Sequence, residues 1–249
     1  MVLSLLDWNV WAFNEDLEGV LAFITAENAD VVCLQEVSVP LLEKLTQETP
    51  YPFLFKARDA YHKRDGDRNP SFLVIMARHR VVGADAIVFK RQKKRILLAR
   101  LLGIEEGIEF QYADILCGEK RVRFFNVHLE CVAGPKRRVA QFDEVTRLFQ
   151  YGANIVCGDL NILRVWYTFF FRLVLGSWDE LWEREHDFFA RVFGKHALSN
   201  IFEGAVTHDF TGTQLDYILV PKATRVEEKV LFEDTFGSDH RPMLVRLSV

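Results

Sequence analysis

Short apolar runs alternate along the chain with stretches whose apolar residues recur at the helical period of about 3.6 residues. A short apolar run between turn residues is typical of a buried strand. One predicted helix follows Asn14, a residue type that caps helix N-termini, and another presents Phe142 and Val145 on one face. The predicted strands are Val2–Val10, Val31–Leu34, Phe72–Met76, Ile87–Phe89, Arg95–Leu102, Ile108–Leu116, Val122–Val127, Ile155–Cys157, Leu215–Val220 and Met243–Leu247.

Strands followed by helices, mixed with hairpins, predict a layered α/β domain. No linker or fixed-period repeat interrupts the pattern, so we expect one domain over residues 1–249 with an aromatic helical insertion at about 162–196. Within the insertion, Ser177 and Glu180 have the spacing of a capping box, and an apolar stripe then runs to Gly194, a natural helix end. Two amphipathic helices are predicted there. They either pack on their own domain or face lipid or a partner protein.

Composition narrows the class of protein. The 249 residues include 31 Lys and Arg against 35 Asp and Glu, a net charge of −4 that excludes a general polycation but leaves room for a local basic groove. An aromatic content of 13% excludes a disordered chain. Cys33 and Cys157 lie in apolar runs, which favours core side chains over a disulfide or zinc site. The absence of a basic leader and of a membrane-length apolar run predicts a cytoplasmic protein.

Polar residues stand where several predicted strands end. Ligands bind at such strand ends in α/β sheets, because the loops there present side chains from a rigid scaffold. Taken singly, Asn9 could bond a turn, Glu36 could cap a helix, and His128 could be a satisfied buried histidine. The segments are Trp8-Asn9, Gln35-Glu36, Asn126-Val127-His128-Leu129, Gly158-Asp159-Leu160-Asn161, Leu215-Asp216-Tyr217 and Ser238-Asp239-His240-Arg241-Pro242.

Together these segments contain the groups of a phosphoryl-hydrolysing site. Asp159 and Asn161 are two residues apart, so on an extended chain their oxygen-bearing side chains lie on one side. Carboxylate and amide oxygens are hard ligands that suit Mg²⁺ or Mn²⁺ rather than Zn²⁺. Histidines can donate protons to phosphate oxygens or hold a water, and a carboxylate that the metal does not need can act as a base.

In this order the six segments resemble the endonuclease/exonuclease/phosphatase superfamily, which includes deoxyribonuclease I, abasic-site endonucleases, neutral sphingomyelinases, inositol polyphosphate 5-phosphatases and tyrosyl-DNA phosphodiesterase 2. The resemblance spans Trp8 to Pro242. It implies a four-layer α/β sandwich, with two mixed sheets face to face and helices outside. It also implies hydrolysis of phosphodiester bonds with Mg²⁺ or Mn²⁺ as the cofactor.

The resemblance further implies a metal site. Glu36 would be the principal ligand, and Asn9 and Asp239 would complete or support the site. Trp11 stands where abasic endonucleases carry an Asp, which argues against that branch.

The remaining polar residues would carry the chemistry. The resemblance implies that Asp159 orients or deprotonates the attacking water and that Asn161 fixes this water and a phosphate oxygen. His240, polarised by Asp216, and His128 would stabilise the charge that develops on phosphorus-bound oxygens. A His at position 128 favours the deoxyribonuclease, sphingomyelinase and tyrosyl-DNA phosphodiesterase branches.

Basic residues gather within 56–68, 90–95 and 136–138. Such runs are either solvated surface or loops that meet a phosphate backbone or an anionic membrane. We expect nucleic acid as the substrate, with Arg137 and Arg138 among the contacts. One alternative is a sphingomyelinase-type lipid phosphodiesterase that uses the aromatic insertion at a membrane surface. The other is a catalytically inactive binding module.

Overall fold

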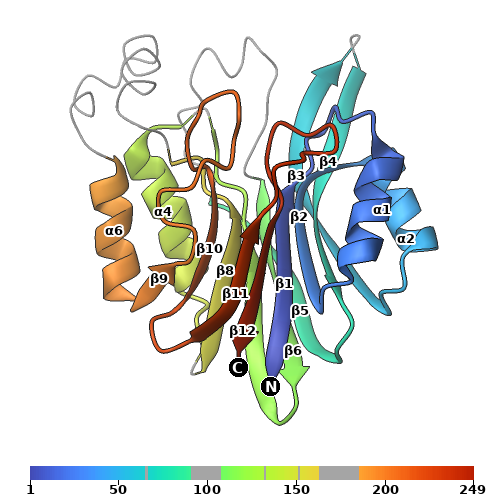
Figure 1. Cartoon of the computed structure of the whole chain (residues 1–249). Helices are drawn as coiled ribbons and strands as arrows, with labels where there is room; N and C mark the ends of the chain where they lie inside the picture. The colour runs from blue at the N-terminus through green and yellow to red at the C-terminus, as the bar shows by residue number, and fades with distance from the viewer. Residues whose placement is uncertain (65–66, 91–107, 132, 151, 163–184) are drawn as a thin grey trace.

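The computed structural model describes residues 1–64, 67–90, 108–131, 133–150, 152–162 and 185–249. Two six-stranded sheets of mixed direction pack face to face, and helices cover the outer face of each sheet (Figure 1). This is the four-layer α/β sandwich that the sequence predicts. The predicted strand over Arg95–Leu102 lies outside the described residues.

The strand order is β11-β12-β1-β2-β4-β3 in the first sheet and β5-β6-β7-β8-β10-β9 in the second. The first sheet consists of β1 (Val2–Asn9), β2 (Val31–Ser38), β3 (Phe53–Arg64), β4 (Asp67–Ala77), β11 (Arg225–Leu231) and β12 (Met243–Ser248). The second consists of β5 (Val81–Val88), β6 (Glu109–Cys117), β7 (Lys120–Asn126), β8 (Ala153–Asp159), β9 (Leu198–Asn200) and β10 (Asp216–Pro221).

Three apolar layers hold the sandwich together. Helices α1 (Leu17–Glu27) and α2 (Val39–Glu48) cover the first sheet, while α4 (Pro135–Thr146) and α6 (Glu185–Lys195) cover the second (Figure 1). Strand β1 is buried on both faces, because Leu5 faces the second sheet and Trp8 packs under α1. A strand between two layers has no solvent face, which explains its continuous apolar run.

The topology carries the polar segments to one edge of the sandwich. Strands β1 and β2 are parallel in the first sheet, and β7 and β8 are parallel in the second, so the carboxyl ends within each pair lie together. Antiparallel β10 begins at Asp216, directly opposite Asp159 at the end of β8. The strand ends meet at the top of Figure 1, opposite the chain termini.

A buried polar chain joins the two sheets beneath this edge. Gln35 Nε2 donates to Asp7 Oδ1 over 2.9 Å and to Asn126 Oδ1 over 2.8 Å. Asn126 Nδ2 in turn donates to Leu34 O over 2.9 Å and to Val74 O over 3.0 Å. All three polar side chains are fully buried. Burial, together with the nearby charge of Asp216, holds the pKa of Asp7 well above its ordinary value.

Several element boundaries differ from the sequence predictions. The N-cap of α1 is Asp16, whose carboxylate accepts from Gly19 N, whereas Asn14 is buried and bonds Val10 O and Phe236 O. Helix α2, capped by Ser38, and strands β3 and β11 were not predicted. Strands β3 and β11 are edge strands that carry many charges, so neither shows an apolar run.

Helix α6 is the described part of the predicted aromatic insertion. It begins at Glu185 and ends at Lys195, one residue beyond the predicted stop. Phe189 and Phe193 lie 5.8 Å and 5.5 Å from Phe142 of α4, ring centre to ring centre, so this helix packs on its own domain. The capping box at Ser177 lies outside the described residues. Within the residues that are described, no helix has the length and apolar character needed to cross a membrane.

The polar chain between the sheets predicts a stability effect. Gln35→Met leaves the oxygens of Asp7 and Asn126 without their donor, so we expect the free energy of unfolding to fall by about 2 to 4 kcal/mol. Gln47→Met, on the exposed face of α2, is the matched control and should change it by less than about 0.5 kcal/mol. Urea denaturation measures both. Equal effects of the two substitutions would contradict a stabilising role for the Gln35 hydrogen bonds.

Candidate active site

Asn9 connects the two sheets at the edge where the strands end. Its Nδ2 donates to Glu36 Oε1 over 3.1 Å in the first sheet and to Asp159 Oδ2 over 3.2 Å in the second. Its Oδ1 accepts from Trp11 N over 3.0 Å. The amide nitrogen of Asn9 thus serves the supporting role included in the sequence prediction, and ligation of a cation through the second lone pair of Oδ1 stays a prediction. Asn9 orients the two carboxylates.

Glu36 is held by an irregular stretch of β2. A bulge between Leu34 and Val37 interrupts the pairing with β4, and Glu36 itself has a φ of 55°, which is uncommon for a residue with a Cβ. Glu36 N donates to Asp59 Oδ2 over 2.9 Å, and Glu36 Oε2 accepts from Ala12 N over 3.1 Å. Glu36 is therefore held both at its backbone N–H and at its carboxylate.

The end of β8 turns sharply to present Asp159 and Asn161. Gly158 has a φ of 127°, and a Cβ there would lie 2.0 Å from Val127 O, so only glycine fits. Asn161 N donates to Asp159 Oδ1 over 2.8 Å, which turns the carboxylate. Asn161 Nδ2 donates to Leu129 O over 2.9 Å. Both predicted residues are buried at the site.

His240 and Asp216 form the predicted hydrogen-bonded pair. His240 Nδ1 lies 2.8 Å from Asp216 Oδ2, and both side chains are buried. Burial lowers the pKa of His240, but the charge and hydrogen bond of Asp216 outweigh it and raise that pKa to about 10. Thr207 Oγ1 accepts from the backbone N–H of Asp216 over 3.0 Å, which fixes the start of β10.

His128 has a partner that the sequence motifs do not contain. Its Nδ1 lies 2.9 Å from Asp59 Oδ1 and 3.0 Å from Asp59 Oδ2, and Asp59 is fully buried in β3. Burial disfavours the charged ring, yet the charge of Asp59 raises the pKa of His128 well above its ordinary value. The sequence signal for Asp59 was an acidic residue within the basic stretch 56–68, and in the structure it lies at a bulge between Arg58 and Ala60.

The two histidines converge on one carboxylate. His128 Nε2 and His240 Nε2 each lie 3.8 Å from Asp159 Oδ2. Burial and the charge of Asp216 raise the pKa of Asp159 above its ordinary value, against the opposing effect of the two imidazoles. A carboxylate between two potential proton donors, each backed by a second carboxylate, can orient a water and move a proton.

Asp239 lies next to His240 and contacts a second residue outside the motifs, His208. His208 Nε2 is 3.3 Å from Asp239 Oδ2, and the ring centres of His208 and His240 are 4.5 Å apart. Burial raises the pKa of Asp239, but the His208 hydrogen bond and the charge of His240 outweigh it and leave this pKa below its ordinary value. The sequence signal was the polar stretch that precedes Leu215-Asp216-Tyr217.

The donor set fits a hard divalent cation. Glu36 and Asp239 supply carboxylate oxygens at the rim, and Asp239 Oδ1 is buried without a hydrogen-bond partner among the described residues. Ligand atoms of His208, Asp239 and His240 lie within 4.8 Å of one another, as do those of Asp159, Asp216 and His240. Carboxylate oxygens such as those of Glu36 and Asp239 are the donors that suit Mg²⁺ or Mn²⁺.

Arg138 does not lie at this site. Its guanidinium is buried, donates to Glu185 Oε1 and Oε2 over 2.6 and 2.7 Å, and reaches three loop carbonyls. Arg138 joins α4 to α6 through Glu185, so the predicted substrate contact is wrong for this residue. Arg137 is 2.5 Å from Glu130 Oε2 and keeps part of its side chain exposed.

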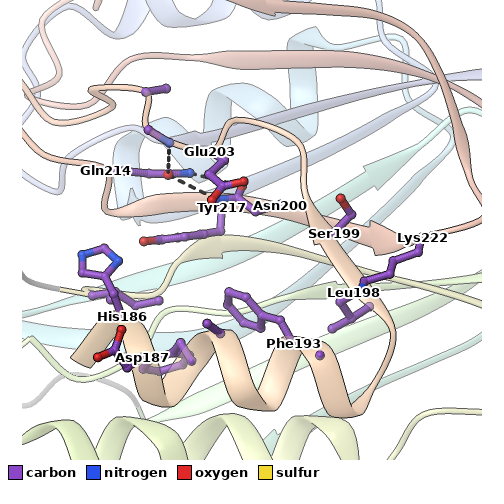
Figure 2. Close-up of a pocket in the computed structure, with 16 residues that line it drawn as sticks. His186, Asp187, Phe193, Leu198, Ser199, Asn200, Glu203, Gln214, Tyr217 and Lys222 are labelled. Carbon is purple, nitrogen blue, oxygen red and sulfur yellow. Dashed lines mark hydrogen bonds between the residues drawn. The ribbon is translucent and has the colours of Figure 1, made fainter. Parts of the chain in front are cut away.

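A separate cavity of about 670 Å³ lies between α6 and the β9–β10 region. Figure 2 shows Asp187 and Phe193 of α6 on one side, with Asn200 and Gln214 on the other. Asn200 and Gln214 exchange hydrogen bonds of 3.2 and 3.3 Å. None of the predicted site residues lines this cavity, which places it apart from the candidate active site.

The fold matches solved structures over nearly the whole chain. An endonuclease/exonuclease/phosphatase from Beutenbergia cavernae DSM 12333 is 18% identical with a TM-score of 0.74, covering 100% of this chain and 72% of that protein. D. rerio TDP2 complexed with a single strand DNA product is 15% identical with a TM-score of 0.67, covering 100% and 99%. A Bacteroides thetaiotaomicron VPI-5482 mannosyl-6-phosphatase is 16% identical with a TM-score of 0.68, covering 99% and 100%. At these identities the likeness shows the fold alone.

No curated protein matches the chain by sequence. The model of the Endonuclease/Exonuclease/phosphatase family, however, matches residues 8–240. That span begins one residue before Asn9 and ends at His240, so it includes every residue that converges at the strand ends. The chain belongs to the endonuclease/exonuclease/phosphatase family.

Proposed function

We propose that this member of a family of phosphoester hydrolases is a divalent-metal-dependent phosphodiesterase that acts on nucleic acid. The observation that carries the proposal is the position of Asp159. Its Oδ2 lies 3.8 Å from the Nε2 atoms of His128 and His240, and each imidazole is backed by a buried carboxylate. This arrangement places a base between two groups that can carry positive charge.

Glu36 and Asp239 would hold Mg²⁺ or Mn²⁺. When bound, the cation supplies Lewis-acid polarisation of a phosphate oxygen and neutralises negative charge. Asn9 keeps the Glu36 carboxylate in place through its 3.1 Å hydrogen bond. The backbone N–H of Ala12 does the same for the second oxygen of Glu36, so little reorganisation is needed when the site fills.

Asp159 would orient the attacking water and accept its proton. A pKa raised by burial brings this carboxylate closer to the operating pH, where a general base is most effective. Asn161 N fixes one carboxylate oxygen, Oδ1, which leaves Oδ2 facing Asn9 and the two histidines. Water attack in line with the leaving oxygen would then take place beside Oδ2.

His128 and His240 would stabilise the charge that grows on the non-bridging oxygens. Each pKa is raised by a partner carboxylate, Asp59 for His128 and Asp216 for His240, so both pairs favour the cationic form of the ring. Cations fixed before the reaction stabilise the transition state more than the ground state. Intact pairs of this kind support an enzyme over an inactive binding module.

A nucleic-acid substrate is supported by likeness of fold. The D. rerio TDP2 that shares this fold was solved with a single strand DNA product. The mannosyl-6-phosphatase shares the fold as well, so the substrate requires its own experiment.

A substrate panel tests the proposal. We expect hydrolysis of bis-p-nitrophenyl phosphate and of single- or double-stranded DNA with Mg²⁺ or Mn²⁺, and slower or no hydrolysis of sphingomyelin, inositol phosphates and mannose 6-phosphate. Product release is measured for each substrate with an EDTA control. Preference for sphingomyelin in vesicles would support the lipid alternative, and preference for a phosphate monoester would contradict a diesterase.

Metal dependence is tested through Glu36. Glu36→Gln keeps the shape of the side chain but removes its charge, so we expect the rate at limiting Mg²⁺ to fall by about 100-fold or more and to recover partly at high Mg²⁺. Glu43→Gln, on the exposed face of α2, is the matched control. Initial rates on bis-p-nitrophenyl phosphate measure both variants. Full activity of the parent protein in EDTA would rule out a metal-dependent reaction.

The charge on His240 predicts a pH dependence. The cationic ring is the active form, so on the alkaline side the parental rate should fall as pH rises through about 10, the pKa that Asp216 supports. Asp216→Asn removes the negative charge and lowers this pKa, which moves the fall in rate to a lower pH. His240→Ala should cost about 100-fold or more at every pH. Rate profiles on one soluble diester measure all three proteins, and identical profiles for the parent and Asp216→Asn would refute this role.

A further inference from the structure

His208 stands beside the proposed catalytic groups on a fixed backbone. His208 N donates to Thr213 O over 3.2 Å, and Asp209 N donates to Asp239 O over 3.2 Å. These bonds hold the segment from both sides. The residue is 8% exposed, and its imidazole lies edge-on against the ring of His240. Its position is therefore set by the chain around it rather than by a free loop.

A neighbouring amide determines which ring nitrogen of His208 carries the proton. Thr211 N donates to His208 Nδ1 over 3.1 Å, and the Thr211 hydroxyl, which can donate or accept, lies 2.9 Å from the same nitrogen. A nitrogen that accepts a backbone N–H carries no proton itself, so the neutral ring carries its proton on Nε2. This is the reverse of a metal-bound histidine, whose second nitrogen donates a proton to a carbonyl or carboxylate. His208 therefore points a donor at Asp239, not a lone pair at a cation.

The donor acts on one oxygen of Asp239 and leaves the other available. Nε2–H of His208 is directed at Oδ2, 3.3 Å away. Oδ1 is buried, has no hydrogen-bond partner among the described residues, and lies 3.8 Å from His240 Nε2. The carboxylate is thus turned so that Oδ1 faces the site.

We propose that His208 is a positioning residue that orients Asp239 for the divalent cation by donating Nε2–H to Oδ2. The inference rests on the proposed function, in which Asp239 and Glu36 hold that cation. Partners that orient a metal ligand are typically worth about 10- to 100-fold in metal affinity. Because His208 acts through Asp239, its loss should weaken cation binding more than it slows turnover at a saturating cation concentration.

Two amide substitutions separate the functions of the two ring nitrogens. In His208→Gln the side-chain NH₂ reaches the place of Nε2 and keeps the donor to Asp239. In His208→Asn the shorter side chain places its oxygen near Nδ1, which keeps the Thr211 contact and removes the donor. Should His208→Asn fail to fold, His208→Phe keeps a ring against His240 and also lacks the donor. Thermal melting of the full chain identifies folded variants.

Calorimetric titration with Mn²⁺ measures affinity and stoichiometry without reference to activity. We expect the Mn²⁺ Kd to rise about tenfold or more in His208→Asn and to stay within about threefold of the parent in His208→Gln. The half-saturating Mn²⁺ for bis-p-nitrophenyl phosphate should follow the same order, with saturated kcat changed by less than about threefold.

Three results would overturn the inference. These are parental Mn²⁺ affinity in folded His208→Asn, equal loss in both variants, and loss of one bound Mn²⁺ per chain in His208→Gln, which would make His208 a ligand. A different result would refute the proposed function without refuting the role of His208. If the parent binds Mn²⁺ with the expected order among variants but hydrolyses no phosphoester, the role of His208 toward Asp239 stands and the activity does not.

Discussion

The candidate site depends on contact between two sheets, because each buried pair in it takes one partner from each. His240 precedes β12 of the first sheet and bonds Asp216 of the second, while His128 follows β7 of the second sheet and bonds Asp59 of the first. Asn9 bonds a carboxylate in both sheets. Buried polar groups without a partner are costly, so these pairs favour one alignment of the sheets over any neighbouring one.

Much of the site could be predicted from the sequence because its residues follow strands that are apolar on both faces. Strand β8 shows this: its buried run marks where Asp159 must emerge. Asp59 could not be found in this way, since it lies within an edge strand rich in charge, and its role appears only when β3 is placed beside His128, which follows β7. The same holds for His208, which acts through residues far away in the chain.

Residue type alone does not show which partner an amide or a guanidinium side chain will contact. An Asn near a metal site can present oxygen or nitrogen, and at Asn9 the nitrogen contacts Glu36 and Asp159 while the oxygen accepts from Trp11 N. An Arg in a basic run can face solvent or a buried acid, and Glu185 decides it for Arg138. The partner that settles the role of Arg138, Glu185, lies outside the motif that contains this Arg. Overall architecture was easier, because the alternation of apolar runs and helical periods needs no long-range information.

The second sheet is formed by one continuous stretch from Val81 to Pro221, whereas the first closes around it with strands from both ends of the chain. Strand β1 pairs with β12, so residues from opposite ends of the sequence become neighbours, as Leu3 and Leu247 do. Contacts this distant in sequence are slow to form. During synthesis, β1 therefore lacks one of its two neighbours until β12 has been translated, which happens only after the whole second sheet. His240 comes just ahead of β12 in the chain, so a nascent chain can complete the candidate site only after the strands of both sheets that supply its other residues have been made.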